Sequence, residues 1–468
     1  MNGMTIFKHI IVLTALGALI SCGGGSGGGA TNLDPSFGIN GKVTTEFISG
    51  SPAQGHAMVI QGDDKIVMGG YAHNGSDYDF ALARYNVDGT LDTSFGSAGT
   101  GKVMTDFAGR DEQINALAID GSGRIVVAGY TRVLGGRIFA LARYNIDGTL
   151  DTSFGSGTGK VITTFYDISA TYEQANAIAV QTDGKIVVAG GVNNGTSRDF
   201  AVARYNTDGS LDTSFNNLDP FCFTGFICNG KQRTDFNSDA DNVYAVVIRT
   251  DGKIVVAGYA DSLIGGVDGD FALARYNANG RLDTSFGFAG TGKVTTPFYS
   301  GSRWINIARA MILQTDGKIV VAGKVDNGTN NDFALARYYA DGTLDTSFNY
   351  SSVCALGNPC AGQVVTDFNG NNDVAYAITI QPIDNKIVVV GSASIGSGTD
   401  FALVRYNTDG TLDTSFGSAG SGKVTTNFGG TNNDVAHAVA LQSDGKIVAA
   451  GYTHNGTNYT FALARYLP

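Results

Sequence analysis

The sequence predicts an all-β fold, namely a seven-bladed propeller built from four-stranded blades. The chain is rich in glycine, with 66 in 468 residues, and poor in proline, with seven. Many short strands joined by tight turns produce this composition, and a tandem repeat of roughly 60 residues is typical of a closed propeller array. The repeat is marked by the phrase Leu-Asp-x-Ser-Phe, which begins at Leu33, Leu91, Leu150, Leu211, Leu282, Leu344 and Leu412.

Each repeat is predicted to contain four strands. A short strand such as residues 41–47 comes first, followed by an apolar strand such as residues 177–181. A hairpin turn, for example Asp183-Gly184, supplies the positive φ that tight hairpins need and leads into the β-branched run 185–190. The fourth strand is the phrase Phe-Ala-Leu-Ala-Arg-Tyr, as at residues 80–85. Four strands per repeat describe one propeller blade.

The two ends of the repeat array predict how the ring closes. The first repeat begins with a lone short strand, residues 42–47, and the last repeat ends with the fourth strand, residues 461–466. If the short strand is the outermost strand of a blade, the final blade lacks one. The N-terminal strand is therefore expected to complete it, because closure removes the exposed sheet edges of an open array.

Alternation along the fourth strand gives it one bulky face, with Phe80, Leu82 and Arg84, and one nearly flat face. We expect the bulky face of one blade to pack on the flat face of the next. A charge pair that recurs in every repeat indicates structure rather than a ligand site, so we predict an Arg–Asp pair inside each blade. The arginines are Arg84, Arg143, Arg204, Arg275, Arg337, Arg405 and Arg465, and the aspartates are Asp34, Asp92, Asp151, Asp212, Asp283, Asp345 and Asp413.

The N-terminus has the pattern of an export signal. Lys8 and His9 precede an apolar run, residues 10–20, that is too short to span a bilayer. The run ends in Leu19-Ile20-Ser21-Cys22, which resembles the lipobox of bacterial lipoproteins. The resemblance implies a signal peptide over 1–21, lipidation at Cys22 and a Gly-rich tether over 22–32. Gly23 after the cysteine implies an outer-membrane lipoprotein, whereas ordinary secretory cleavage is the alternative.

The four remaining cysteines form two local pairs. Both pairs lie in insertions at the same place of two repeats, with five residues between the partners. In an exported chain this spacing favours two disulfides that close loops over a metal site, which would need four ligands from two separate repeats. The pairs are Cys222 with Cys228 and Cys354 with Cys360.

A candidate ligand-binding ring lies where the repeats differ from one another. One position, predicted to open each innermost strand at a mouth of the channel, always carries a side chain that can form hydrogen bonds and is always followed by alanine. Such a ring would bind a ligand, or it would simply solvate the strand ends. The seven residues are His56, Asn115, Asn176, Tyr244, Arg309, Tyr376 and His437.

Other candidate sites are weaker. His56 matches His437 and His73 matches His454 in neighbouring repeats, but no carboxylate or cysteine stands at ligand spacing beside them. Trp304, in an insertion, is either a contact residue or a cover over the core. The sequence therefore predicts no metal ion and no cofactor.

The repeat phrases Leu-Asp-Thr-Ser-Phe-Gly, Asp-Gly-Lys-Ile-Val-Val-Ala-Gly and Phe-Ala-Leu-Ala-Arg-Tyr-Asn resemble the delta-60 repeat of bacterial proteins. The resemblance covers nearly all of residues 33–466 and makes 33–468 one propeller domain. It implies no activity. Repeat six departs from the pattern at Pro382-Ile383-Asp384-Asn385 and repeat four at Lys231-Gln232-Arg233, which leaves the local geometry of these two segments open.

Composition and motifs narrow the function. A net charge of −11 without a Lys/Arg run excludes a nucleic-acid backbone as the partner. The sequence shows no catalytic triad, phosphate loop or zinc spacing, so an enzyme is not the leading expectation. We expect a monomeric lipoprotein of the cell envelope that acts as a binding scaffold for a glycan or an envelope protein. The alternatives are a hydrolase or lyase that acts on extracellular polymers at the propeller mouth, and a purely structural envelope component.

Overall fold

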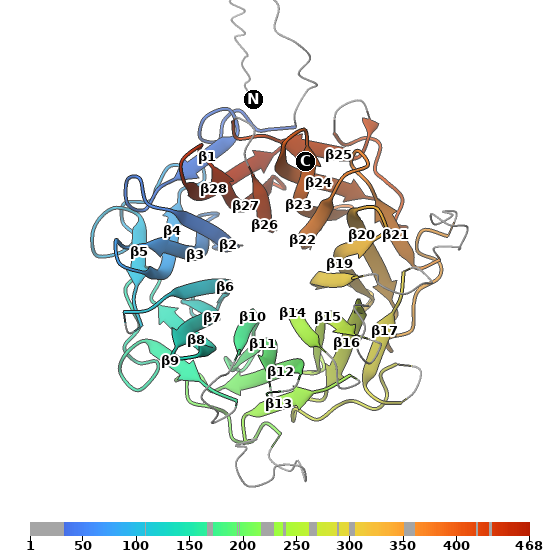
Figure 1. Ribbon diagram of the computed structural model, residues 1–468, viewed down its shortest axis with the longest axis horizontal. Helices are drawn as coiled ribbons and strands as arrows, with labels where there is room; N and C mark the ends of the chain where they lie inside the picture. The colour runs from blue at the N-terminus through green and yellow to red at the C-terminus, as the bar shows by residue number, and fades with distance from the viewer. Residues whose placement is uncertain are drawn as a thin grey trace, which may run out of the picture.

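The protein is a seven-bladed propeller. A computed structural model describes residues 32–107, 109–165, 172–193, 195, 197–216, 229–236, 240–261, 269–287, 290–298, 305–350, 361–417, 420–429 and 433–468. Within these residues, 28 strands form seven antiparallel sheets of four strands arranged around one axis (Figure 1). The predicted fold class is confirmed. The predicted signal peptide, Cys22, the two cysteine pairs and Trp304 lie outside the described residues.

In each blade the strands follow one another in the sheet from the innermost to the outermost. Blade 1 contains β2 (Ala53–Ile60), β3 (Ile66–His73), β4 (Tyr78–Tyr85) and β5 (Lys102–Thr105). Blade 2 contains β6 (Glu112–Ile119), β7 (Ile125–Val133), β8 (Gly136–Tyr144) and β9 (Lys160–Thr163). Blade 3 contains β10 (Gln174–Val180), β11 (Ile186–Asn193), β12 (Arg198–Tyr205) and β13 (Lys231–Thr234). Blade 4 contains β14 (Asp241–Ile248), β15 (Ile254–Asp261), β16 (Gly269–Tyr276) and β17 (Lys293–Thr296).

The remaining three blades complete the ring. Blade 5 contains β18 (Ile307–Leu313), β19 (Ile319–Asp326), β20 (Asn331–Tyr338) and β21 (Gln363–Thr366). Blade 6 contains β22 (Asp373–Ile380), β23 (Ile387–Ile395), β24 (Gly398–Tyr406) and β25 (Lys423–Thr426). Blade 7 contains β26 (Val435–Leu441), β27 (Ile447–His454), β28 (Tyr459–Tyr466) and β1 (Lys42–Thr45). Within the described residues, no helix is long and apolar enough to span a membrane.

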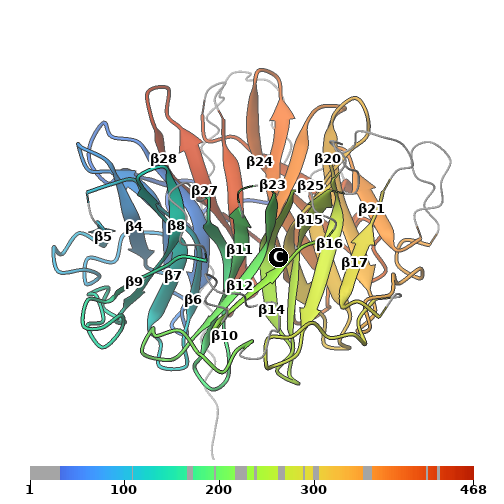
Figure 2. The same cartoon turned by 60° about the horizontal axis from the view of Figure 1, so that its bottom comes forward.

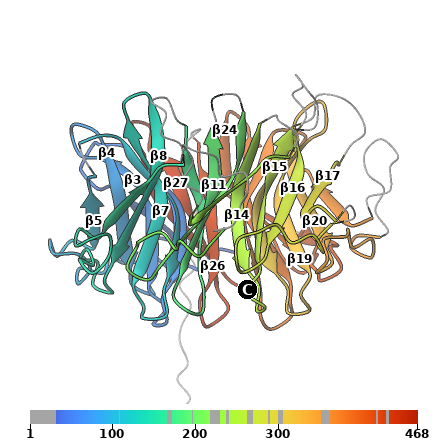
Figure 3. The same cartoon turned by 90° about the horizontal axis from the view of Figure 1, so that it is seen from below.

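The strands run between two faces that carry different loops (Figures 2 and 3). We call one the hairpin face, because it carries the hairpins between the second and third strands, such as residues 74–77, and the connections between blades, such as 46–52. The other is the turn face, which carries the tight turns after the innermost strands, such as residues 61–65, and the long connections that contain Leu-Asp-x-Ser-Phe. Every innermost strand therefore starts at the hairpin face.

The ring closes as the repeat register predicts. β1 pairs antiparallel with β28, with Lys42 opposite Ala464 and Thr45 opposite Phe461. The N-terminal strand is thus the outermost strand of blade 7. This pairing joins the two ends of the described propeller in one sheet and leaves β28 with no open edge.

The bulky face of each blade packs on the flat face of the next blade, as the alternation along the fourth strand predicts. Ala81 and Ala83 of β4 lie in one core cluster with Phe461 and Leu463 of β28 in the preceding blade. A buried tyrosine hydroxyl, for example that of Tyr85, also forms a hydrogen bond across the interface to a threonine of the preceding blade's outermost strand. The seven pairs are Tyr85–Thr45, Tyr144–Thr105, Tyr205–Thr163, Tyr276–Thr234, Tyr338–Thr296, Tyr406–Thr366 and Tyr466–Thr426.

The predicted Arg–Asp pair is present in all seven blades, at N–O distances from 2.6 to 2.9 Å. In blade 5, for example, Arg337 lies 2.8 Å from Asp345, which is fully buried. The same carboxylate also binds Lys318 and accepts hydrogen bonds from Ser347. These contacts hold the pKa of Asp345 well below its usual range. The pairs are Arg84–Asp92, Arg143–Asp151, Arg204–Asp212, Arg275–Asp283, Arg337–Asp345, Arg405–Asp413 and Arg465–Asp34.

Arg337→Ala should lower the free energy of unfolding by about 3 kcal/mol, because it removes the main partner of a buried carboxylate. Arg132→Ala is the control, since Arg132 pairs with Asp111 at 3.2 Å in a half-exposed position and its loss should cost less than about 1 kcal/mol. Urea denaturation followed by circular dichroism measures both. Equal losses in the two variants would contradict a locking role for the pair.

Removal of residues 1–49 should destabilise the whole propeller, because it exposes the edge of β28 and takes Asp34 away from Arg465. We expect aggregation or a large fall in the melting temperature, measured by size-exclusion chromatography and thermal denaturation. A chain that starts at Asn32 keeps both features and serves as the control. A stable monomer without β1 would show that closure is dispensable.

Candidate ligand-binding site in the central channel

The seven sequence-predicted ring residues are all bulge residues of the innermost strands. In β2 the pairing with β3 shifts between Gly55 and Ala57, so that His56 has no opposite partner. The same shift occurs around the other six members, namely Asn115, Asn176, Tyr244, Arg309, Tyr376 and His437. The expectation that these residues open their strands is wrong, because they are the third or fourth residue of each strand.

A glycine on the neighbouring strand makes room for each bulge. A Cβ atom at Gly70 would lie 1.9 Å from the carbonyl oxygen of Gln54, which no side chain can accept. A bulge twists the strand and redirects the extra side chain. The glycine that recurs near the middle of each second strand, after alanine in five of the seven blades, is the sequence signal for this geometry and was not recognised from the sequence. The equivalent glycines are Gly70, Gly129, Gly190, Gly258, Gly323, Gly391 and Gly451.

Five of the ring side chains contact one another across blade boundaries. The imidazoles of His56 and His437 lie 4.8 Å apart, centroid to centroid, and Tyr376 lies 4.4 Å from His437. The guanidinium of Arg309 lies over the rings of both Tyr376 and Tyr244, at 4.8 and 5.1 Å. Since these residues come from five different blades, their side chains meet near the axis, where the innermost strands face one another (Figure 1).

The two asparagines link the ring to the backbone of neighbouring blades. Asn115 donates to the carbonyl oxygen of Ala175 and Asn176 donates to that of Val243, both at 2.8 Å. Their amide groups therefore serve the contacts between blades 2, 3 and 4. Asn115 and Asn176 therefore form a part of the ring that is fixed by hydrogen bonds to the backbone. The other five residues form a part made of aromatic rings and one guanidinium group.

The two ring histidines are neutral at pH 7. Burial lowers the pKa of His56 to about 4 and also lowers that of His437, with further repulsion from His56 and Arg309. The Nε2 atom of His56 and the Nε atom of Arg309 are buried without a hydrogen-bond partner.

A second layer of tyrosines surrounds the ring on the side of the hairpin face. Tyr71, Tyr259 and Tyr452 follow the bulge-matching glycines and stack near His56, Tyr244 and His437, respectively. Tyr130 occupies the same position in blade 2, and Lys324 occupies it in blade 5. This layer was not predicted from the sequence. The signal was the residue after each bulge-matching glycine, because its identity differs between repeats just as the identity of the ring residue does.

Four cations lie in or beside these layers. Arg309 and Lys324 belong to blade 5, and mutual repulsion together with burial lowers the pKa of Lys324. Arg137 lies 4.1 Å from the ring of Tyr130, and Arg198 lies 4.6 Å from that of Tyr172. None of the four forms an ion pair with another residue of the described chain, whereas most other arginines do.

His73 and His454 do not join the ring. Each lies at the end of a second strand, accepts a hydrogen bond from the glycine two residues on, and packs against a tyrosine of the same hairpin. Within the described residues, none of the clusters of possible metal ligands contains a histidine. The two residues therefore stabilise their hairpins.

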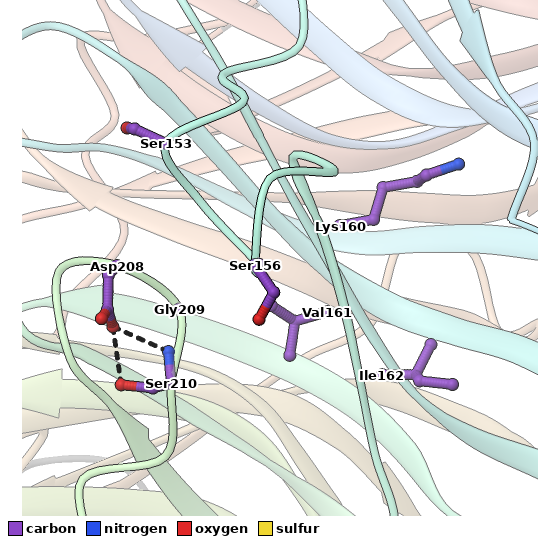
Figure 4. Close-up of a pocket in the computed structure, with 9 residues that line it drawn as sticks. Ser153, Ser156, Lys160, Val161, Ile162, Asp208, Gly209 and Ser210 are labelled. Carbon is purple, nitrogen blue, oxygen red and sulfur yellow. Dashed lines mark hydrogen bonds between the residues drawn. The ribbon is translucent and has the colours of Figure 1, made fainter.

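Two pockets lie away from the channel. One, of about 370 Å³, lies on the turn face between the long connection of blade 2 and a turn of blade 3 (Figure 4). Its carboxylate, Asp208, already accepts hydrogen bonds from the backbone and hydroxyl of Ser210. The other, of about 470 Å³, lies between blades 6 and 7 near Glu46 and Asn455. The first is built from residues that recur in the repeat, so it is a seam between blades and not a distinctive site.

Acid should test the buried histidines. Because the folded pKa of His56 lies near 4 and the ordinary value is 6.5, the unfolded chain binds more protons between these pH values. This residue alone should remove up to roughly 3 kcal/mol of stability as the pH falls from 6.5 to 4. In His56→Gln the loss should be correspondingly smaller, as measured by urea denaturation across that pH range. Identical pH profiles would contradict the burial of a neutral imidazole.

The chain has distant similarity to several solved structures. They include a protein of unknown function from Dyadobacter fermentans, with 10% identity, a TM-score of 0.45 and coverage of 92% of this chain and 99% of the other. A catalytically inactive virginiamycin B lyase from Staphylococcus aureus with quinupristin has 8% identity, a TM-score of 0.46 and coverage of 90% and 98%. The polysaccharide lyase Uly1 has 10% identity, a TM-score of 0.45 and coverage of 88% and 89%. Likenesses this distant say nothing about activity.

No curated protein matches the sequence. A family model does, and its description is a domain of unknown function, the DUF5122 β-propeller. It matches seven segments, one in each repeat, which together make up about half of the chain: residues 61–95, 121–154, 181–215, 249–286, 314–348, 384–416 and 442–468. The protein therefore belongs to the DUF5122 β-propeller family.

Proposed function

We propose that this protein binds an anionic glycan in the channel mouth on the hairpin face. The observation that carries the proposal is the gathering of tyrosines and unpaired cations from several blades at one end of the axis. Tyrosine rings offer flat surfaces for sugar faces and hydroxyls for their polar edges, and binding sites commonly combine such surfaces with a few polar groups.

The charge of the mouth supports an anionic ligand. The protein has a net charge of −11, yet Arg309, Lys324, Arg137 and Arg198 lie around the mouth without carboxylate partners in the described chain. Half-buried cations that are left unpaired cost free energy unless an anion reaches them. A carboxylate or sulfate group on a sugar would supply that charge.

The pattern of the N-terminus supports the proposal that the protein lies at the cell envelope. A signal peptide over 1–21 and a diacylglycerol on Cys22 would anchor it at the outer membrane through the tether, with disulfides Cys222–Cys228 and Cys354–Cys360 in two loops. The delta-60 resemblance fits a bacterial envelope protein of this kind. In this setting the propeller is a binding scaffold, and an envelope glycan or the glycan of an envelope protein is its partner.

The test is calorimetric titration with polygalacturonate, with uncharged dextran as the neutral polymer. We expect binding of the acidic polymer alone, and roughly a tenfold weaker affinity in both Arg309→Ala and Lys324→Ala, which corresponds to about 1.4 kcal/mol each. Arg132→Ala is the matched control, because Arg132 is already paired with Asp111. Equal affinity for dextran, or full affinity in both mouth variants, would refute the proposal. No binding of either polymer would favour a purely structural role.

One observation favours a second candidate, a lyase that acts on acidic polymers. His56 is neutral, its Nε2 atom has no partner in the described chain, and its ring lies near those of His437 and Tyr452. Tyr376 lies next to His437, and Arg309 lies over the ring of Tyr376. A neutral imidazole can accept a proton while a nearby cation stabilises the carboxylate of the substrate. Ultraviolet-absorbing unsaturated ends, released from polygalacturonate by the protein but not by His56→Ala or His437→Ala, would establish the lyase.

A further inference from the structure

Three clusters of three carboxylates lie on the hairpin face, away from the channel ring. The cluster of Asp199, Asp235 and Asp241 already pairs with the guanidinium of Arg233, which leaves two others. One contains Asp79, Asp106 and Glu112, and we call it the 1/2 triad because it joins blades 1 and 2. The other contains Asp332, Asp367 and Asp373 and is called the 5/6 triad. In each triad the three residues offer oxygen atoms that lie within 4.8 Å of one another.

The repeat explains how each triad assembles. Asp79 precedes the Phe-Ala-Leu-Ala-Arg-Tyr phrase of β4, and Asp106 follows β5, its neighbour in the sheet. Glu112 is the first residue of β6, the innermost strand of the next blade. Asp332, Asp367 and Asp373 have the same places on β20, β21 and β22. Each triad thus spans the boundary between two blades.

Each triad contains a buried oxygen atom that no group satisfies. Asp79 is 5% exposed and Asp332 is 4% exposed, and the Oδ1 atom of each has no hydrogen-bond partner. The Oδ2 atoms accept hydrogen bonds from the hairpin amides of Asn74 and Asn327. A buried carboxylate oxygen without a donor is costly, so the free Oδ1 atoms indicate that each triad receives a further positive group.

The aspartates equivalent to Asp79 in two other blades already have such a group beside them. In blade 3, Asp199 occupies the place of Asp79, and the guanidinium of Arg233 lies 3.0 Å from it. In blade 6, Asn427 replaces the exposed aspartate, and its amide donates to Asp400 at 2.7 Å. The repeat therefore supplies a cationic or donating side chain at two interfaces, and one of these is the interface with the third carboxylate cluster, Asp199, Asp235 and Asp241.

The charges in each triad repel one another. Burial raises the pKa of Glu112 and of Asp373 to about 7, and nearby carboxylates raise both further. The neighbouring lysines, Lys160 and Lys423, donate to the backbone carbonyl oxygens of Asp106 and Asp367, so their ammonium groups are already engaged. A small cation with oxygen ligands would relieve this repulsion and bind the unsatisfied Oδ1 atom at the same time.

We propose that the 1/2 and 5/6 triads each bind one divalent cation of the calcium class. Ca²⁺ takes oxygen ligands from several carboxylates and tolerates irregular geometry, as a site assembled from three separate segments requires. Each ion fastens the outer strands of one blade to the innermost strand of the next. The sites are independent of the channel ligand, so they extend the function proposed for the mouth. The sequence-based expectation of no metal ion considered histidine and cysteine ligands only.

The experiment is calorimetric titration of the chelator-treated full protein with Ca²⁺ at pH 8, accompanied by thermal denaturation. We expect two ions per chain and a melting temperature that rises by several degrees with Ca²⁺. Asp79→Asn combined with Asp332→Asn should abolish both effects. The matched control is Asp270→Asn, because Asp270 occupies the same place in blade 4, where Pro297 and Asn306 stand in for the other two carboxylates. Absence of Ca²⁺ binding by the unsubstituted protein, or binding that survives in the double variant, would overturn the proposal.

A second measurement needs no substitution and remains decisive if the double variant fails to fold. The raised pKa values mean that the folded triads hold protons which the unfolded chain releases, so their contribution to stability is lost as the pH rises through 7. Without Ca²⁺ this contribution should therefore lower the melting temperature between pH 6 and pH 8, and Ca²⁺ should bind more tightly at pH 8 because protons no longer compete. Failure of Ca²⁺ to raise the melting temperature at pH 8 would also overturn the proposal.

Discussion

The propeller depends on one buried arginine per blade that acts in two directions. Its Nε or Nη2 atom binds the aspartate of a Leu-Asp-x-Ser-Phe segment. In six blades its Nη1 atom donates to a carbonyl oxygen in a turn of the next blade. The guanidinium also covers the phenylalanine of Leu-Asp-x-Ser-Phe, at 4.3 to 4.6 Å. One side chain therefore fixes the long connection, the core phenylalanine and the next blade together.

This concentration of contacts explains why the sequence predicts the scaffold so well. An arginine and an aspartate that recur in every repeat at the same separation have to meet, and the position of the lone N-terminal strand allows one simple closure. Even the departures in repeats four and six keep the fold: Asn385 takes the positive φ of the lost glycine, and Arg233 forms an ion pair with Asp199. Repetition makes long-range contacts visible in a single sequence.

The candidate site was harder to predict, for a physical reason. A bulge adds one residue to a strand without changing its composition, so the alternation around His56 gives no sign that its side chain turns toward the axis. Sequence analysis identified the ring by its variability and misplaced it along the strand. The tyrosine layer and the acidic triads depend on residues from different strands, such as Asp79, Asp106 and Glu112, whose proximity becomes visible only in the folded blades.

The glycine opposite each bulge has an evolutionary consequence. Because Gly70 and its equivalents make room for the bulge, the bulge residue does not belong to the hydrophobic core between blades, and imidazole, amide, phenol and guanidinium groups all occupy that position. Selection can therefore alter the lining of the channel one blade at a time, with little penalty to the hydrophobic core. Seven variable positions on a constant frame let the channel lining change while the architecture stays the same.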